Sequence, residues 1–140
     1  MIKSIYIIIL IFLIPVSDSP GQLQQGIPAE ISMAFKAGNA EILAGYLNST
    51  VELVMPDGED FYKKGVAEGI IKEFFRTHRT TDFIIKHQGG RSDARYAIGD
   101  LRTTEGTFRI YFLMKIIDEK PLIHQLRSEK NDKDSNLPAY

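Results

Sequence analysis

The segment "FRIYFLMKII", residues 108–117, limits the fold more than any other part of the sequence. Every second residue in it is apolar, and these are Phe108, Ile110, Phe112, Met114 and Ile116. Successive side chains of a β-strand point to opposite faces, so the pattern predicts a strand with one wholly apolar face. Its other face mixes charged, aromatic and aliphatic residues. An antiparallel sheet of this kind packs helices on the first face and exposes the second to water or to a partner.

Further strands are predicted on both sides of this one. "DFIIKHQ", "ARYAIGDLRT" and "LIHQLRSE" are separated by the turn sequences "GGRSD", "TEG" and "DEKP". Gly99 lies in the middle of a strand pattern and predicts a bulge or sharp bend that curls the sheet. Earlier in the chain, residues 51–55 alternate as a strand, and "PDGED" turns the chain into "FYK". This part predicts a short hairpin.

Three helices are predicted before and between these strands. The first begins near Pro28 and ends at Gly38, which supplies a left-handed C-cap, and Asn39 caps a second short helix. The third, "KKGVAEGIIKEFFRTH", has so wide an apolar arc that we expect it to be the most buried. Its Gly65 and Gly69 either allow close backbone packing or have no packing role. Helices followed by a long antiparallel sheet indicate an α+β fold.

Composition and charge exclude several classes of function. The chain has 140 residues and a net charge of −1, so it lacks the basic character of a nucleic-acid binder. It has no cysteine, which excludes disulfides, thiolate metal sites, a cysteine nucleophile and lipoprotein acylation. Its three histidines are scattered without metal-ligand spacing. We therefore expect no metal and no cofactor.

The N-terminal residues follow the pattern of a secretory signal peptide. Lys3 precedes an apolar run over residues 5–14, which at ten residues is too short to span a bilayer. We predict a signal peptide over residues 1–21, cleavage between Gly21 and Gln22, and a periplasmic or secreted product with no stable membrane span. The alternative is an uncleaved membrane anchor. The domain is predicted over residues 22–130, and the polar tail 131–140 is predicted to be disordered.

The order of these elements resembles the NTF2-like cone, an α+β fold whose curved sheet wraps around its helices. More narrowly, "AFKAGNAEILAGYLNSTVELVM", "FFRTHRTTDFIIKHQG", "YAIGDLRTTEGTFRIYF" and "IHQLRSE" resemble the DUF4783 family of exported Bacteroidetes proteins, which has no assigned activity. The resemblance implies a ligand site in the mouth of the cone and dimerisation through the outer face of the sheet. This chain departs from the family pattern at Lys63 and Lys64, where a serine often caps the third helix. That departure implies a frayed helix start.

Few residues are suited to a site inside such a cone. His87 shares the predicted face of Phe83 and Ile85, and His124 shares that of Leu126. The alternative for His87 is a strand-edge position beside the glycine turn, and for His124 a satisfied core or rim position. The residues predicted to line a ligand cavity are His87, His124, Phe112 and Met114.

The outer face of the sheet has the composition of a protein interface. Aromatic residues and arginine on a broad flat surface are typical of such interfaces. We predict that it forms a homodimer, with a solvated monomer face as the alternative. Asp100 is predicted there too, as a cross-strand partner of Arg109. The residues predicted to carry the interface are Tyr96, Arg109, Tyr111 and Leu113.

Three hypotheses about function follow. The first is a non-enzymatic exported domain that binds a small apolar ligand, a peptide or another envelope protein. The second is an enzyme of the isomerase or hydratase type that uses a histidine in the cone. The third is a structural module that acts only through its outer sheet face. The lack of an evident inward acid–base pair favours the first and the third.

Overall fold

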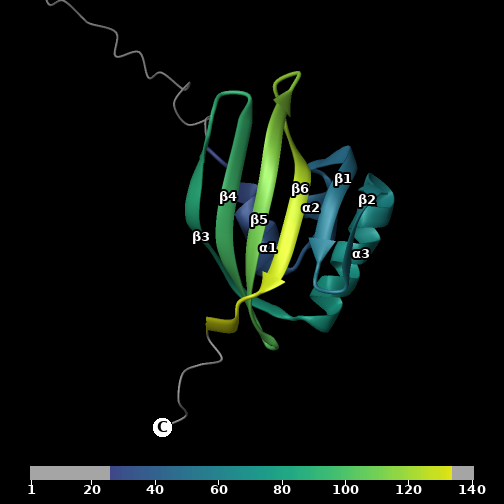
Figure 1. Ribbon diagram of the computed structural model, residues 1–140, viewed down its shortest axis with the longest axis vertical. Coiled ribbons are helices and arrows are strands. Elements are labelled where there is room, and N and C mark those ends of the chain that lie inside the picture. The colour runs from purple at the N-terminus through teal and green to yellow at the C-terminus, as the bar shows by residue number, and fades with distance from the viewer. Residues whose placement is uncertain (1–25, 134–140) are drawn as a thin grey trace, which may run out of the picture.

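The computed structural model describes residues 26–133 (Figure 1). Its elements are α1 (Ala29–Ala37), α2 (Ala40–Ala44), β1 (Leu47–Met55), β2 (Gly58–Lys63), α3 (Lys64–Thr77), β3 (Thr80–Gly90), β4 (Ala94–Thr103), β5 (Gly106–Ile117) and β6 (Lys120–Lys130). This order confirms the predicted α+β architecture. The predicted signal peptide, its cleavage site and the tail from residue 134 lie outside the described residues. Within them, no helix combines the length and the apolar character needed to cross a membrane.

The strands form one sheet in the order β2-β1-β6-β5-β4-β3. Neighbouring strands are antiparallel except β1 and β6, which are parallel and are connected through the rest of the sheet and α3. Figure 1 shows α1 and α2 behind the long strands and α3 beside the β1–β2 hairpin. The helices therefore cover one face of the sheet and leave the other open.

The apolar face of β5 is the concave lining, as predicted. Phe108, Ile110, Phe112 and Met114 are all buried, and Ile116 is half-buried near the end of the strand. The ring of Phe35 on α1 lies over this face, 5.9 Å from the ring of Phe112 between centroids. Burial of aromatic and aliphatic side chains at about 1.5–3 kcal/mol each is the main source of stability in such a core.

The helix ends follow the sequence signals. Gly38 has a φ of 64°, the left-handed conformation expected of a glycine C-cap. The side chain of Asn39 accepts a hydrogen bond of 3.0 Å from the backbone N–H of Ile42 and so caps α2. At the start of α3, Lys63 makes no capping hydrogen bond through its side chain, as expected from its departure from the family pattern.

The prediction that α3 is the most buried helix is wrong. Ala67, Ile71, Phe74 and Phe75 are buried, but the side chain of Val66 is 55% exposed. The helix lies at the hairpin end of the sheet, where it packs on α2 and on β1. One side of its wide apolar arc is covered by these neighbours, and the other side is left open.

Gly99 is a point of close approach, and the bulge lies opposite it in β3. The pairing of β3 with β4 shifts by one residue between Ile85 and His87, next to Gly99. A Cβ atom on Gly99 would lie only 2.6 Å from the ring of Phe83 and 2.9 Å from the carbonyl oxygen of Ile84. The glycine therefore makes room for Phe83 in the core. Gly65 and Gly69 have no such role, because added Cβ atoms would meet nothing within 4 Å.

Candidate functional site

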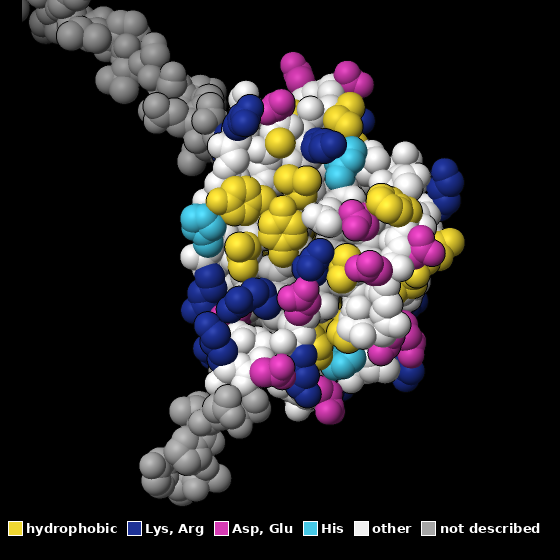
Figure 2. Space-filling model, viewed as in Figure 1, with side chains coloured by type: hydrophobic (Ala, Val, Ile, Leu, Met, Phe, Trp, Pro, Cys, Tyr) yellow, Lys and Arg dark blue, Asp and Glu magenta, His cyan; other side chains and the backbone are white. Residues whose placement is uncertain are grey.

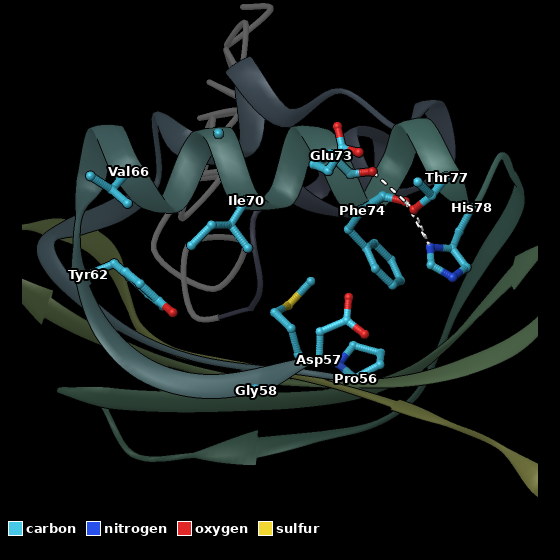
Figure 3. A pocket seen from close by; sticks show the side chains of 12 residues that line it. Pro56, Asp57, Gly58, Tyr62, Val66, Ile70, Glu73, Phe74, Thr77 and His78 are labelled. Carbon is cyan, nitrogen blue, oxygen red and sulfur yellow. Dashed lines mark hydrogen bonds between the residues drawn. The ribbon is translucent and has the colours of Figure 1, made fainter.

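A pocket of about 490 Å³ lies between α3 and the β1–β2 hairpin (Figure 3). Its apolar wall is formed by Val66, Ile70 and Phe74 of α3 together with Met55 at the end of β1. The three helical residues are four positions apart, so they form one stripe on the helix that faces the hairpin. This is the open side of the apolar arc. The pocket therefore explains why Val66 remains exposed.

The polar groups of the pocket lie toward its two ends. Figure 3 shows Tyr62 of β2 near Val66, whereas Asp57 in the hairpin turn lies toward the end that holds His78. Tyr62 pairs with the buried Val51 of β1, and this register turns its side chain to the concave side of the sheet. His78 is the C-cap residue of α3, so the helix end places its imidazole at the pocket rim.

The imidazole of His78 is held in one orientation. Its Nδ1 lies 3.0 Å from the carbonyl oxygen of Phe74 and 2.9 Å from the hydroxyl oxygen of Thr77. The ring also stacks on Phe74 at 4.5 Å and meets the ring of Phe108 edge-on at 4.9 Å between centroids. A carbonyl oxygen can only accept a hydrogen bond, so Nδ1 carries a proton. In the neutral ring the lone pair is then on Nε2.

The two acids of the pocket differ in their partners. Glu73 forms an ion pair with Arg76 one turn later in α3, and the hydrogen bond from this guanidinium lowers the pKa of Glu73. Asp57 has no hydrogen bond or ion pair within residues 26–133. Its carboxylate is thus the uncompensated charge of the lining. No histidine, aspartate or glutamate cluster in this part of the chain could hold a metal ion.

The cone interior is filled, which corrects the prediction for Phe112 and Met114. Both side chains face inward as expected, but they are core residues with exposures of 0% and 1%. The ring of Phe35 takes up the space above them, 4.7 Å from the ring of Phe83. A chamber of about 10 Å³, the size of one water molecule, lies next to Ser128. Phe112 and Met114 therefore do not line a ligand cavity.

The predicted inward position of His87 is also wrong. Ile85 pairs with Gly99 on the concave side, but after the bulge His87 pairs with Ile98 on the outer face. The extra residue of a bulge reverses the alternation, so His87 leaves the face of Phe83. Its side chain is exposed there. The alternative, a hydrogen-bonded histidine at the strand edge, describes it correctly.

His124 lies in a second bulge and does not reach a cone cavity. In the pairing of β5 with β6, Met114 is opposite Ile123 and Leu113 is opposite Gln125, which leaves His124 without a cross-strand partner. Its Nε2 is buried and has no hydrogen-bond partner among residues 26–133, so the prediction of a satisfied residue is wrong as well. Burial, followed by the nearby charge of Lys115, lowers the pKa of His124.

The residues predicted for an interface do share the outer face. Tyr96, Tyr111 and Leu113 are half-buried and Arg109 is exposed, all on the side opposite the helices. Figure 2 shows this face, with hydrophobic side chains gathered over β4 and β5 and basic side chains beside them. Asp100 and Arg109 are cross-strand neighbours as predicted. Within the described residues, however, no ion pair joins their side chains.

Sequence reasoning missed the residues that form the pocket. The sequence patterns predict no role in a site for His78, Tyr62 or Asp57. One sequence signal could have indicated the pocket. The apolar arc of α3 is wide, and the strand β2 beside it has only 6 residues. Such a helix has more apolar surface than its short neighbour can cover.

Comparisons with known proteins agree with this fold. The family model "Domain of unknown function (DUF4783)" matches residues 28–129. A DUF4783 protein from Bacteroides ovatus is 35% identical, with a TM-score of 0.74, over 78% of this chain and 99% of its own. A second, from Bacteroides uniformis, is 34% identical, with a TM-score of 0.73, over 77% of this chain and 100% of its own.

A more distant structure supports the wider fold class. An NTF2-like protein of unknown function from Cytophaga hutchinsonii is 12% identical, with a TM-score of 0.54, and covers 76% of this chain and 88% of its own. At that identity the likeness concerns the fold alone. The search of curated proteins returned no match. On the family model and the Bacteroides structures together, the chain belongs to the DUF4783 family and has the NTF2-like fold.

Proposed function

We propose that the protein is a non-enzymatic binding domain that holds a small apolar ligand in the pocket between α3 and the β1–β2 hairpin. The observation that carries this proposal is the apolar stripe of the exposed Val66 and the half-buried Ile70, which lines a hollow that no described part of the chain fills. Ligand sites are typically concave, mainly apolar and of about 300–1,000 Å³. A ligand that buries this stripe would gain about 25 cal/mol per Å² of apolar surface.

The polar groups of the pocket favour binding over catalysis. A general acid that works near neutral pH needs a raised pKa, and the pKa of Glu73 is lowered by Arg76. Neither of the histidines first considered for catalysis, His87 and His124, lines the pocket. These features support a site that holds its ligand without transforming it.

A matched pair of variants tests ligand binding. The probe is decanol, a neutral amphiphile, titrated into the protein by calorimetry below its solubility limit. Val66→Glu puts a charge into the apolar wall and is expected to weaken binding at least tenfold. Met33→Glu makes the same change at a side chain on α1 that is 67% exposed and outside the pocket. No binding to the wild type, or equal loss in both variants, would contradict the proposal.

Homodimerisation through the outer face is a second candidate function, supported by the register of the sheet. One row of neighbouring outer-face residues runs across all six strands: His87, Ile98, Tyr111, Arg127, Val54 and Glu59. In the proposed dimer, a two-fold axis runs parallel to the strands between β5 and β6, and the outer faces of two copies pack against each other. Each end of the row then meets the opposite end of the other copy.

The row is complementary to itself under that operation. His87 would meet Glu59 of the second copy, and Ile98 would meet Val54. At the centre Tyr111 would meet Arg127, an arrangement suited to a cation–π contact. Polar residues at the edges, with aliphatic residues, tyrosine and arginine between them, match the polar rim and the core composition of a protein interface. This pattern favours a pairing face over a merely solvated one.

Light scattering on the purified protein tests the dimer. The expected result is a dimer in the wild type and a monomer for Ile98→Glu, because this change places a carboxylate against the apolar Val54 of the second copy. Met33→Glu serves as the control, since Met33 is also exposed but lies on α1, on the helix-covered side of the sheet. A wild type that stays monomeric at high concentration removes the claim.

Export completes the proposed role. Lys3 and the apolar run over residues 5–14 support a leader that is removed on the way to the periplasm or the exterior. An immunoblot of cell fractions is expected to show a shortened product outside the cytosol. Full-length protein in the cytosol would refute export, and full-length protein in the membrane would support the uncleaved anchor.

A further inference from the structure

We infer that the pocket selects a protonated amine: the Asp57–His78 end receives an ammonium group, and the apolar wall receives the hydrocarbon attached to it. This inference rests on the proposed binding function and names the chemical class of its ligand. It follows from the hydrogen-bonding capacity of the groups at that end, most of which can only accept.

His78 provides a fixed acceptor. Because Nδ1 donates to the carbonyl oxygen of Phe74, the neutral ring has its lone pair on Nε2. A flipped ring would put a carbon atom where Nδ1 now lies and would lose the contacts with Phe74 and Thr77. Within residues 26–133 no group hydrogen bonds to Nε2. The acceptor is therefore open to a ligand.

Asp57 provides a free negative charge at the same end. An ionised carboxylate accepts hydrogen bonds and donates none. The charge of Glu73 is offset by Arg76, whereas that of Asp57 is not offset by any described side chain. No lysine or arginine is among the residues that line the pocket. The end of the pocket near Asp57 thus has a net negative charge, which attracts a cation.

The side-chain donors of the lining are engaged or lie elsewhere. The hydroxyl of Thr77 is within 3.1 Å of the carbonyl oxygens of Glu73 and Phe74, to which it donates. The hydroxyl of Tyr62 is placed toward the Val66 end, as Figure 3 shows. A ligand group bound between Asp57 and His78 must therefore bring its own donors.

An alkylammonium group fits this requirement best. It has three donors and no acceptor, and its hydrogen bonds to a carboxylate are charge-assisted and stronger than neutral ones. A carboxylate ligand would be repelled by the negative charge of Asp57, and it would bring no donor for the acceptors of Asp57 and His78. An alcohol could donate one hydrogen bond without gaining from the charge. The expected order of affinity is amine, then alcohol, then acid.

Three probes with the same hydrocarbon chain test this order. Decylamine, decanol and decanoate are titrated into the protein by calorimetry near pH 8, where an alkylamine is protonated. Each probe is kept below the concentration at which it aggregates. Decylamine is expected to bind at least tenfold more tightly than decanol, and decanoate more weakly than either.

Two variants locate the selectivity. Asp57→Asn is expected to weaken the binding of decylamine at least fivefold and to change the binding of decanol by less than twofold. Only the ammonium group interacts with the charge of Asp57. Glu59→Gln removes the same charge from the same hairpin at a residue outside the pocket, and it should change neither probe. His78→Phe keeps an aromatic ring against Phe74 but removes the acceptor, and it should also weaken decylamine more than decanol.

The outcomes separate this inference from the proposed function. Equal binding of the three probes, or equal effects of Asp57→Asn and Glu59→Gln, would overturn amine selection while decanol binding still supported an apolar ligand site. Failure of all three probes to bind would overturn both. A thermal melt of each variant excludes unfolding as the cause of any loss.

Discussion

The Nε2 atom of His87 lies 2.8 Å from the hydroxyl oxygen of Tyr96 on the outer face of the sheet. The two residues come from β3 and β4, and their rings are 5.5 Å apart between centroids. This contact exists because the bulge after Ile85 turns His87 away from the concave face. A single inserted residue thus changes a candidate ligand-binding histidine into a surface hydrogen-bond partner.

Loss of this contact should have little effect. For His87→Ala we expect the free energy of unfolding to fall by less than about 1 kcal/mol, because an exposed hydrogen bond contributes little net stability. Dimerisation should not change, since contacts at the edge of an interface are weak. Tyr96→Phe removes only the hydroxyl, and it should lower the free energy of unfolding by about as much as His87→Ala does. A loss above about 2 kcal/mol in chemical denaturation would show that His87 is a core residue.

Alanine at two glycines should change stability in opposite directions. Gly99→Ala would press a methyl group against the ring of Phe83, and such overpacking costs about 1–3 kcal/mol. Gly69→Ala adds a methyl group in open space within α3 and should stabilise the protein by up to about 1 kcal/mol. Urea denaturation of both variants measures the difference. Stabilisation by Gly99→Ala would contradict the close approach to Phe83.

Removing the hydroxyl of Ser128 should not destabilise the protein. This side chain is buried, and its oxygen has no hydrogen-bond partner in the part of the chain that the structure describes. An unpaired buried polar group costs about 1–3 kcal/mol, so Ser128→Ala should leave the free energy of unfolding unchanged or raise it by about 1 kcal/mol. Ser92→Ala, in an exposed turn, is the control. A clear loss for Ser128→Ala alone would mean that the hydroxyl has a partner.

His124 should make stability fall in mild acid. Burial and Lys115 lower the pKa of His124 below its ordinary value of 6.5, so between the two values the unfolded chain binds more protons than the folded one. The folded state is therefore fully stable above pH 6.5 and loses stability as the pH falls through this value toward the lowered pKa. Denaturation at several pH values should show that the His124→Gln variant loses less stability in mild acid than the wild type does. Identical pH profiles would contradict the shift.

Periodicity was enough to predict most of the fold. The alternation in β5 and the caps at Gly38 and Asn39 depend on residues close in sequence, so they can be recognised without tertiary structure. Bulges are different, because they depend on how many residues the neighbouring strand offers. Each one reverses the facing of the residues that follow it. Both misplaced histidines, His87 and His124, lie at such points.

The pocket could not be predicted for a related reason. An apolar stripe on a helix has the same spacing whether protein or ligand covers it, so the whole apolar arc of this helix is predicted to be buried. The exposure of Val66 follows from the position of α3 beside a short hairpin. The side chain of His78 is fixed by Phe108, a residue far along the sequence. Only the tertiary structure brings these groups together.

Methyl NMR during a decanol titration tests the ligand site most directly. Labelled methyl groups of Val66, Ile70 and Met55 report on the pocket, and those of Ile98 and Leu113 report on the outer face of the sheet. We predict saturable shifts at the first three and none at the other two. Shifts confined to Ile98 and Leu113, or no saturable shift at all, would contradict a ligand site between α3 and the hairpin.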